Sequence, residues 1–241
     1  MSHQGNLRER IGNDSRGLWI AFFGPDGVGK SAVIDRLPAK LGGTFSGFHC
    51  FHFRPRFGRK TVAFPVTAPH AQEPRGWLIS TAKIGWWVLD CWLGYLFLVR
   101  PARRRCHLVI FDRYLPDVLV DPVRYRLPPT TIPVATWLVK LAPQPDVFIL
   151  LDAPADKVQA RKQEVTLAES QRQRQAYSKL FGSLPRALVV DADRPVGEVA
   201  NAVATIISSF ESPVSSFALA PLQRRNPESQ DCALADTQTV T

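Results

Sequence analysis

One short stretch near the amino terminus constrains this chain more than any other part of its sequence. The apolar run Leu18–Phe23 is followed at once by Gly24-Pro-Asp-Gly-Val-Gly-Lys30-Ser31, which fits the pattern G-x-x-x-x-G-K-[ST]. An unbroken apolar run that ends at a glycine is typical of a strand buried on both faces of a parallel sheet. The segment Ser31–Leu41 that follows has helical spacing. A buried strand, a glycine-rich turn and a helix are the context in which this pattern forms a phosphate-binding loop.

The chemistry expected of this loop follows from its residue types. Glycines let the backbone pass close to a phosphate with its N–H groups pointing inward, at a helix N-terminus whose dipole favours anions. Lys30 is expected to reach the β- and γ-phosphates of ATP, and the Ser31 hydroxyl to bind Mg²⁺. Asp112 ends the apolar strand His107–Phe111 and is the second expected magnesium ligand. The expected ATP-binding residues are Gly24, Pro25, Asp26, Gly27, Val28, Gly29, Lys30 and Ser31.

The rest of the chain alternates between apolar strand-like runs and helical patterns. The further predicted strands are Thr44–Phe53, His107–Phe111, Asp146–Leu151 and Ala187–Val190. The further predicted helices are Trp77–Val99, Thr130–Leu141, Pro154–Glu164, a polar arginine-rich helix ending at Leu180, and Val196–Phe210. This alternation indicates βαβ units, and therefore a three-layer α/β P-loop NTPase fold with a parallel sheet flanked by helices. Residues 18–211 are predicted as one domain with an arginine-rich lid at about 153–180, between a disordered leader (1–17) and a disordered tail (212–241).

The net charge of +9 and the pI near 9.8 favour an anionic partner. Basic residues cluster at Arg54–Lys60, Arg100–Arg105 and Arg161–Arg174, without the interleaved aromatic residues of RNA-binding signatures. A solvated basic surface explains each cluster equally well. We therefore expect a nucleotide or another small phosphorylated substrate as the partner, and no nucleic acid.

The cysteines and the most apolar segment bear on where the chain works. The four cysteines are far apart and include no Cys-x-x-Cys pair, which argues against a zinc site or a disulfide framework and suits the reducing cytoplasm. Trp77–Val99 is very apolar, but Lys83 and Asp90 interrupt it, and the uncharged run Trp92–Val99 is much shorter than the roughly 20 residues of a membrane span. We predict a largely buried helix and a cytoplasmic protein, with interfacial membrane contact as the less favoured alternative.

Two motifs together resemble those of a known family. The loop Gly-x-Asp-Gly-x-Gly-Lys-Ser after a buried strand, and an apolar strand that ends in Asp112-Arg113-Tyr114, are similar to the thymidylate kinase family of nucleoside monophosphate kinases. The likeness covers about residues 19–210 and extends to divergent bacterial thymidylate kinase-like proteins, which share the stretch Asp-Pro-x-Arg-Tyr-Arg. The resemblance implies an ATP- and Mg²⁺-dependent kinase that passes the γ-phosphoryl group to a nucleoside monophosphate, with thymidine monophosphate as one candidate, and it implies a homodimer.

The family's functional residues are carried over by position. Asp26 matches the acidic residue that contacts the acceptor's sugar hydroxyl, and Arg54 matches the arginine of an Arg-Glu-Pro turn that binds acceptor phosphate. Arg113 would face the acceptor, and Asp90 corresponds to an aspartate of the family's Ala-Asp-Arg stretch. Gly27 stands where some members carry a catalytic arginine. The resemblance therefore implies that catalytic arginines come from the lid, where Arg161, Arg172 and Arg174 are the candidates.

The sequence leaves the acceptor open. The family's Ser-x-Ala-Tyr-Gln stretch is replaced by Leu115–Arg126, which contains Asp117, Asp121 and Arg124. These residues suit a different polar acceptor pocket, and the two aspartates equally suit turn or helix caps. Another phosphorylated metabolite or a sugar hydroxyl is the alternative acceptor, and for a hydroxyl Asp26 or Asp117 would be the base. A non-catalytic nucleotide switch at a membrane is the alternative to a kinase.

Overall fold

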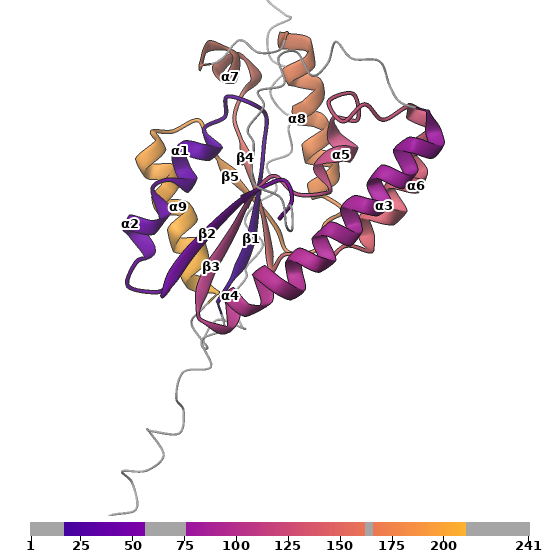
Figure 1. Cartoon of the computed structure of the whole chain (residues 1–241). Helices are drawn as coiled ribbons and strands as arrows, with labels where there is room; N and C mark the ends of the chain where they lie inside the picture. Colours follow the sequence, from indigo (N-terminus) through magenta and orange to yellow (C-terminus); the bar gives the residue numbers. More distant parts are fainter. Residues whose placement is uncertain (1–16, 56–75, 162–165, 211–241) are drawn as a thin grey trace, which may run out of the picture.

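The computed structural model describes residues 17–55, 76–161 and 166–210, and these form a parallel α/β domain (Figure 1). The sheet has the order β2-β3-β1-β4-β5, and every neighbouring pair is parallel. Its strands are β1 (Trp19–Phe23), β2 (Gly47–His52), β3 (His107–Asp112), β4 (Val147–Asp152) and β5 (Ala187–Asp191). The predicted parallel sheet is confirmed. Apart from Gly17, the predicted leader and tail lie outside the described residues.

Helices cover both faces of this sheet, which gives the predicted three layers (Figure 1). One face carries α1 (Lys30–Ile34), α2 (Leu37–Leu41) and α9 (Val196–Ser209). The other carries α3 (Trp77–Gly94), α4 (Arg100–Arg104), α5 (Asp117–Val120), α6 (Ile132–Lys140) and α8 (Leu167–Phe181). The remaining helices are the π-helix η2 (Tyr95–Val99), the 3₁₀-helix η3 (Pro129–Thr131) and α7 (Ala155–Arg161).

The central strand β1 explains why its sequence is apolar at every position. Trp19, Ala21 and Phe23 point into the core under α3, while Ile20 and Phe22 point into the opposite core. All five side chains are at most 1% exposed. A strand covered by helices on both faces leaves no position for a polar side chain. The phosphate-binding loop is therefore attached to a fully buried central strand of the sheet.

Two predicted helices differ from those observed, and a proline accounts for the first difference. The predicted helix Ser31–Leu41 is divided into α1 and α2, and Pro38 lies in the first turn of α2. A proline has no N–H to donate and its ring collides with the carbonyl four residues earlier, so the helix restarts there. The predicted helix Trp77–Val99 continues to Arg104, with the π-helix η2 directly before Pro101. The short helix α5 was not predicted.

The long helix that begins with α3 has one buried and one exposed face. Ile84, Trp87 and Cys91 belong to the core, whereas only 39% of the most apolar window of Trp77–Arg104 is buried. By length and composition this 28-residue helix is the one segment of the described chain that qualifies as a membrane span. The expected burial holds for its inner face only. Its outer face exposes Leu78, Ile79, Trp86, Leu89, Trp92, Leu96 and Phe97.

We expect a second copy of the chain to cover this outer face, because a twofold axis lets one apolar patch cover itself and exposed apolar patches mark such interfaces. The Leu89→Glu substitution, near the middle of the face, should convert the predicted homodimer to a monomer in light-scattering chromatography. Val189→Glu is the matched control, since Val189 is exposed on β5. A monomeric unsubstituted protein at micromolar concentration would contradict this prediction.

Candidate active site

The sheet topology brings the predicted site residues to one edge. From β1 the chain runs to β2, which lies on one side of β1 in the sheet. From β3 it crosses to β4, which lies on the other side of β1. Ligands of open α/β sheets bind outside the carboxyl ends of the strands at such a switch point. The register pairs Phe22 of β1 with Asp112 of β3. This pairing places Asp112 beside the start of the phosphate-binding loop.

The backbone of the loop requires its glycines. Gly24, Gly27 and Gly29 have backbone φ values of 141°, 86° and 102°. Residues other than glycine rarely adopt such values. A Cβ atom on Gly24 would lie 2.6 Å from the carbonyl oxygen of Leu151 on β4. Gly24 therefore allows the loop to leave β1 in close contact with the neighbouring strand.

Lys30 is folded back onto the loop that carries it. Its Nζ donates hydrogen bonds of 2.7 Å to the Gly24 carbonyl and 2.8 Å to the Pro25 carbonyl. Burial lowers the pKa of Lys30 to about 7, and the positive charge of Arg113 adds to this effect. A polyanion in the loop would favour the charged ammonium group and give it a stronger partner than two carbonyls.

Asp112 and Ser31 offer oxygen atoms that suit Mg²⁺. One carboxylate oxygen of Asp112 lies 3.5 Å from the Nδ1 atom of His52. The other, Oδ1, is buried and accepts no hydrogen bond from any described residue. Burial alone would raise the pKa of Asp112, but His52 and Lys30 hold it below the ordinary value, so the group is an ionised carboxylate. An ionised oxygen without a partner and a nearby hydroxyl are a suitable donor set for a hard cation.

Arg113 is a buried cation of the site. It has a left-handed backbone with a φ of 68° and is 4% exposed. Its Nη1 donates to Asp117 Oδ1 at 2.9 Å and to the Tyr177 hydroxyl at 2.7 Å. The Tyr177 and Tyr125 hydroxyls donate to Asp117 at 2.6 and 2.7 Å. Asp117 is fully buried and therefore acts as the counter-charge that fixes Arg113, which a turn cap would not do.

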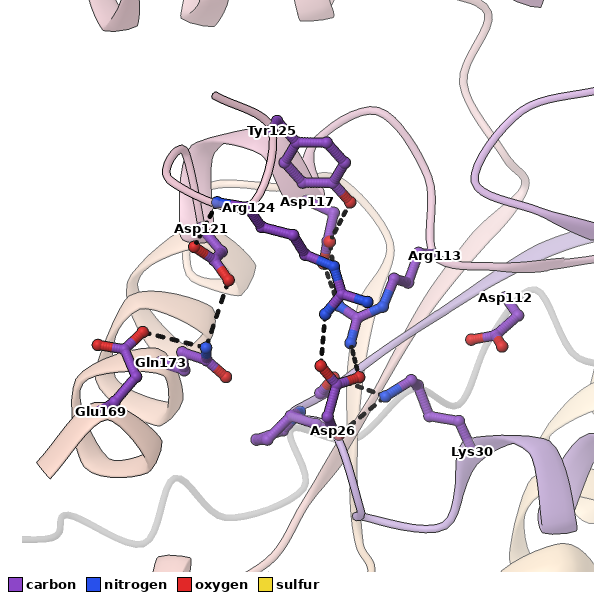
Figure 2. Close-up of polar contacts among 12 residues, drawn as sticks. Asp26, Lys30, Asp112, Arg113, Asp117, Asp121, Arg124, Tyr125, Glu169 and Gln173 are labelled. Atoms are coloured by element: carbon purple, nitrogen blue, oxygen red, sulfur yellow. Dashed lines mark hydrogen bonds and ion pairs between the residues drawn. The ribbon is translucent and has the colours of Figure 1, made fainter. Parts of the chain in front are cut away.

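Asp26 lies between two guanidinium groups (Figure 2). One of its carboxylate oxygens accepts from Arg113 Nη2 at 2.5 Å, and the other accepts from Arg124 Nη1. Burial alone would raise the pKa of Asp26, but Arg113, Arg124 and Lys30 outweigh it and hold that pKa well below the ordinary value. The loop carboxylate is therefore ionised and engaged by both arginines.

These residues enclose one cavity of about 390 Å³. The described residues that line it are Asp26, Gly27, Gly29, Lys30, Ser31, Ala32, His52, Asp112, Arg113 and Arg124. The lining combines the amide-rich phosphate-binding loop with three cationic side chains, those of Lys30, Arg113 and Arg124. The cavity is therefore suited to phosphorylated ligands.

Comparison with known proteins matches the chain by structure and not by sequence. No protein-family model and no curated protein matches it. Among solved structures it is similar to a thymidylate kinase from Candida albicans, with a TM-score of 0.60 and 16% identity over 81% of this chain and 92% of that chain. The chain has a thymidylate kinase-like fold.

Two of the predicted acceptor residues, Arg54 and Asp90, are not among the described residues that line the cavity. Arg54 Nη1 donates to Asp90 Oδ2 at 2.8 Å, and the guanidinium lies 5.2 Å from the centre of the Trp87 ring. Lys83 Nζ lies 4.6 Å from the same ring centre. The face of Trp87 is thus occupied by side chains of the protein itself.

Two of the three predicted lid arginines, Arg172 and Arg174, are engaged in ion pairs. Arg174 donates to both Asp152 oxygens at 2.8 Å, and Arg172 donates to both Glu169 oxygens at 2.7 and 2.6 Å. Arg161 is the last residue of α7, and its side chain lies outside the described part of the chain. The catalytic role of these three arginines stays a prediction.

Sequence reasoning missed Tyr177 and assigned no role to Tyr125. A signal for Tyr177 was present in α8, because the buried residues of this polar helix are Ser170, Gln173, Tyr177 and Phe181. Their spacing follows one helical face. No comparable pattern indicated Tyr125, which lies in the irregular segment after α5.

Removing the charge of Asp117 should destabilise the fold. Because Asp117→Asn leaves the buried Arg113 guanidinium without its counter-charge, we expect a loss of about 3 kcal/mol in urea unfolding followed by tryptophan fluorescence. Tyr177→Phe removes hydrogen bonds and should cost about 1 kcal/mol. The exposed Asp191 pairs with Arg194, so Asp191→Asn should stay within about 0.5 kcal/mol. Equal effects for the two aspartates would contradict this account.

Proposed function

We propose that this chain is an ATP- and Mg²⁺-dependent phosphotransferase of the nucleotide kinase type. Its acceptor is a small phosphorylated compound, with a nucleoside monophosphate as the first candidate. One observation carries the proposal. The loop residues Lys30 and Ser31, the carboxylate of Asp112 and the guanidinium of Arg113 line the same cavity. A protein that only binds nucleotide has no need of an arginine held opposite the phosphate loop.

Each residue has a physical role in this reaction. Lys30 and the loop N–H groups hold the ATP phosphates, and Ser31 and Asp112 are the residues that would hold Mg²⁺. When bound, Mg²⁺ neutralises negative charge on the phosphates. Arg113 orients the acceptor and balances the charge of the transferring group. Most of the catalysis is positioning and charge stabilisation.

The bond changes follow from the acceptor. An acceptor oxygen forms a bond to the γ-phosphorus, the bond from this phosphorus to the bridging β-γ oxygen breaks, and ADP leaves. An ionised phosphate oxygen needs no general base. A hydroxyl acceptor would lose its proton to Asp26, because Asp26 lines the cavity and the fully buried Asp117 is not among the described lining residues. The exposed thiol of Cys50 and the buried thiol of Cys91 are free, in keeping with the cytoplasmic setting that we propose.

Two substitutions separate ATP binding from transfer. Lys30→Met should weaken Mg²⁺-dependent ATP binding by about tenfold or more, since it removes the ammonium group from the phosphate site. Arg113→Lys keeps the charge but lacks the guanidinium fork, and should lower acceptor-dependent ADP release by about 100-fold while ATP affinity stays within about threefold. The measurements are calorimetry for ATP and a coupled ADP assay over a panel of nucleoside monophosphates.

Lys40→Met and Arg194→Ala are the matched controls, because both side chains lie on exposed surfaces away from the cavity. An unsubstituted protein without Mg²⁺-dependent ATP affinity would refute the proposal. ATP affinity together with ADP release that no acceptor stimulates would indicate a nucleotide switch instead.

A further inference from the structure

The side of the cavity opposite the phosphate loop carries two arginines. Arg113 and Arg124 both line the cavity and both donate to the carboxylate of Asp26 (Figure 2). A carboxylate bridged by two guanidinium groups has the same charge-assisted hydrogen bonding as a phosphate held by two arginines. In this arrangement the chain itself supplies the anion between the two arginines.

The two arginines differ in how firmly they are held. The Arg113 side chain is 5% exposed and is fixed by Asp117, whereas the Arg124 side chain is 27% exposed. The backbone N–H of Arg124 donates to Asp121 Oδ1 at 3.2 Å, and the other oxygen of Asp121 accepts from Gln173 of α8 at 3.4 Å. Arg124 is thus presented to the cavity by a segment bonded to α8, with its guanidinium group accessible to a ligand.

Arg54 does not supply this second cation in the present arrangement. Its guanidinium is paired with Asp90 beside Trp87, and Arg54 is not among the described residues that line the cavity. Arg124 instead provides the second guanidinium group, since it donates to the same carboxylate, that of Asp26, as Arg113 does.

We propose that Arg113 and Arg124 form a two-arginine clamp for the anionic group of the acceptor, and that Asp26 occupies this clamp until the acceptor arrives. The inference deepens the proposed function and rests on it. The acceptor anion takes the hydrogen bonds that Asp26 accepts from the two arginines. Asp26 belongs to the phosphate-binding loop, so acceptor binding releases a contact made by the residue four positions before Lys30. Acceptor and ATP sites are thereby coupled through one carboxylate.

A small dianion tests the clamp without knowledge of the acceptor. Methylphosphonate has the charge and shape of a phosphate monoester terminus, and its methyl signal in proton NMR broadens on binding. The protein is first saturated with Mg²⁺ and a non-hydrolysable ATP analogue, so that the phosphate loop is filled. Ionic strength is held constant with chloride, because binding to arginines is sensitive to salt.

The clamp predicts effects of opposite sign for its members. Arg124→Ala should weaken methylphosphonate binding by about tenfold. Arg124→Lys should weaken it less, because the positive charge is kept, although a single ammonium group cannot donate two parallel hydrogen bonds. Asp26→Asn should tighten binding by about threefold, because it removes a competing negative charge. Arg194→Ala should leave binding unchanged.

Each contrary result identifies what fails. An Arg124→Ala affinity within twofold of the unsubstituted protein, or no binding to the unsubstituted protein, would overturn the clamp while leaving ATP binding intact. Weaker binding by Asp26→Asn would overturn the role of Asp26 as the internal occupant. Failure of the ATP analogue to bind would instead overturn the proposed function, and the affinity for this analogue is measured in the same samples.

Discussion

The buried guanidinium of Arg113 is the constraint on which the site depends. A charge that is 4% exposed is tolerated only with a close counter-charge, and Asp117 provides it from one turn further along the chain. That carboxylate is buried too, and the hydroxyls of Tyr125 and Tyr177 satisfy its oxygens. Three segments of the chain are therefore fixed around one cation. The left-handed backbone of Arg113 is held in place by this network.

The same network explains why the cavity is asymmetric. Its inner side, with Arg113 at the end of β3, is tied to the most buried part of the sheet. Its outer side is formed by Arg124, which follows the short helix α5 and is more exposed. A phosphoryl-transfer site needs a fixed position for the reacting phosphates and a more accessible position where the second substrate enters. The buried Arg113 and the more exposed Arg124 match these two positions.

Sequence patterns predicted the parts of the structure that depend on local periodicity. The buried strand β1, the phosphate loop and Asp112 at a strand end follow from apolar runs and a motif whose backbone geometry is specific. The partners of Arg113 did not follow, because Asp117 and Tyr177 are far apart in the sequence and meet only through packing of α5 against α8. The pairing of Arg54 with Asp90 depends on the tertiary structure and could not be predicted by position, and the role of both residues in acceptor binding stays a prediction.

The ion pairs of the lid residues are consistent with a later catalytic role for these arginines. The side chains of Arg172 and Arg174 are 46% and 43% exposed, and pairs of this kind contribute only about 0–1 kcal/mol. An arginine that reaches a transferring phosphoryl group accelerates the reaction by roughly 10³–10⁵, which corresponds to several kcal/mol. Breaking either pair therefore costs much less than the new contact would supply. In contrast, breaking the buried ion pair of Arg113 with Asp117 would cost much more free energy. Arg113 is therefore suited to hold a substrate in a fixed position, and not to move during the reaction.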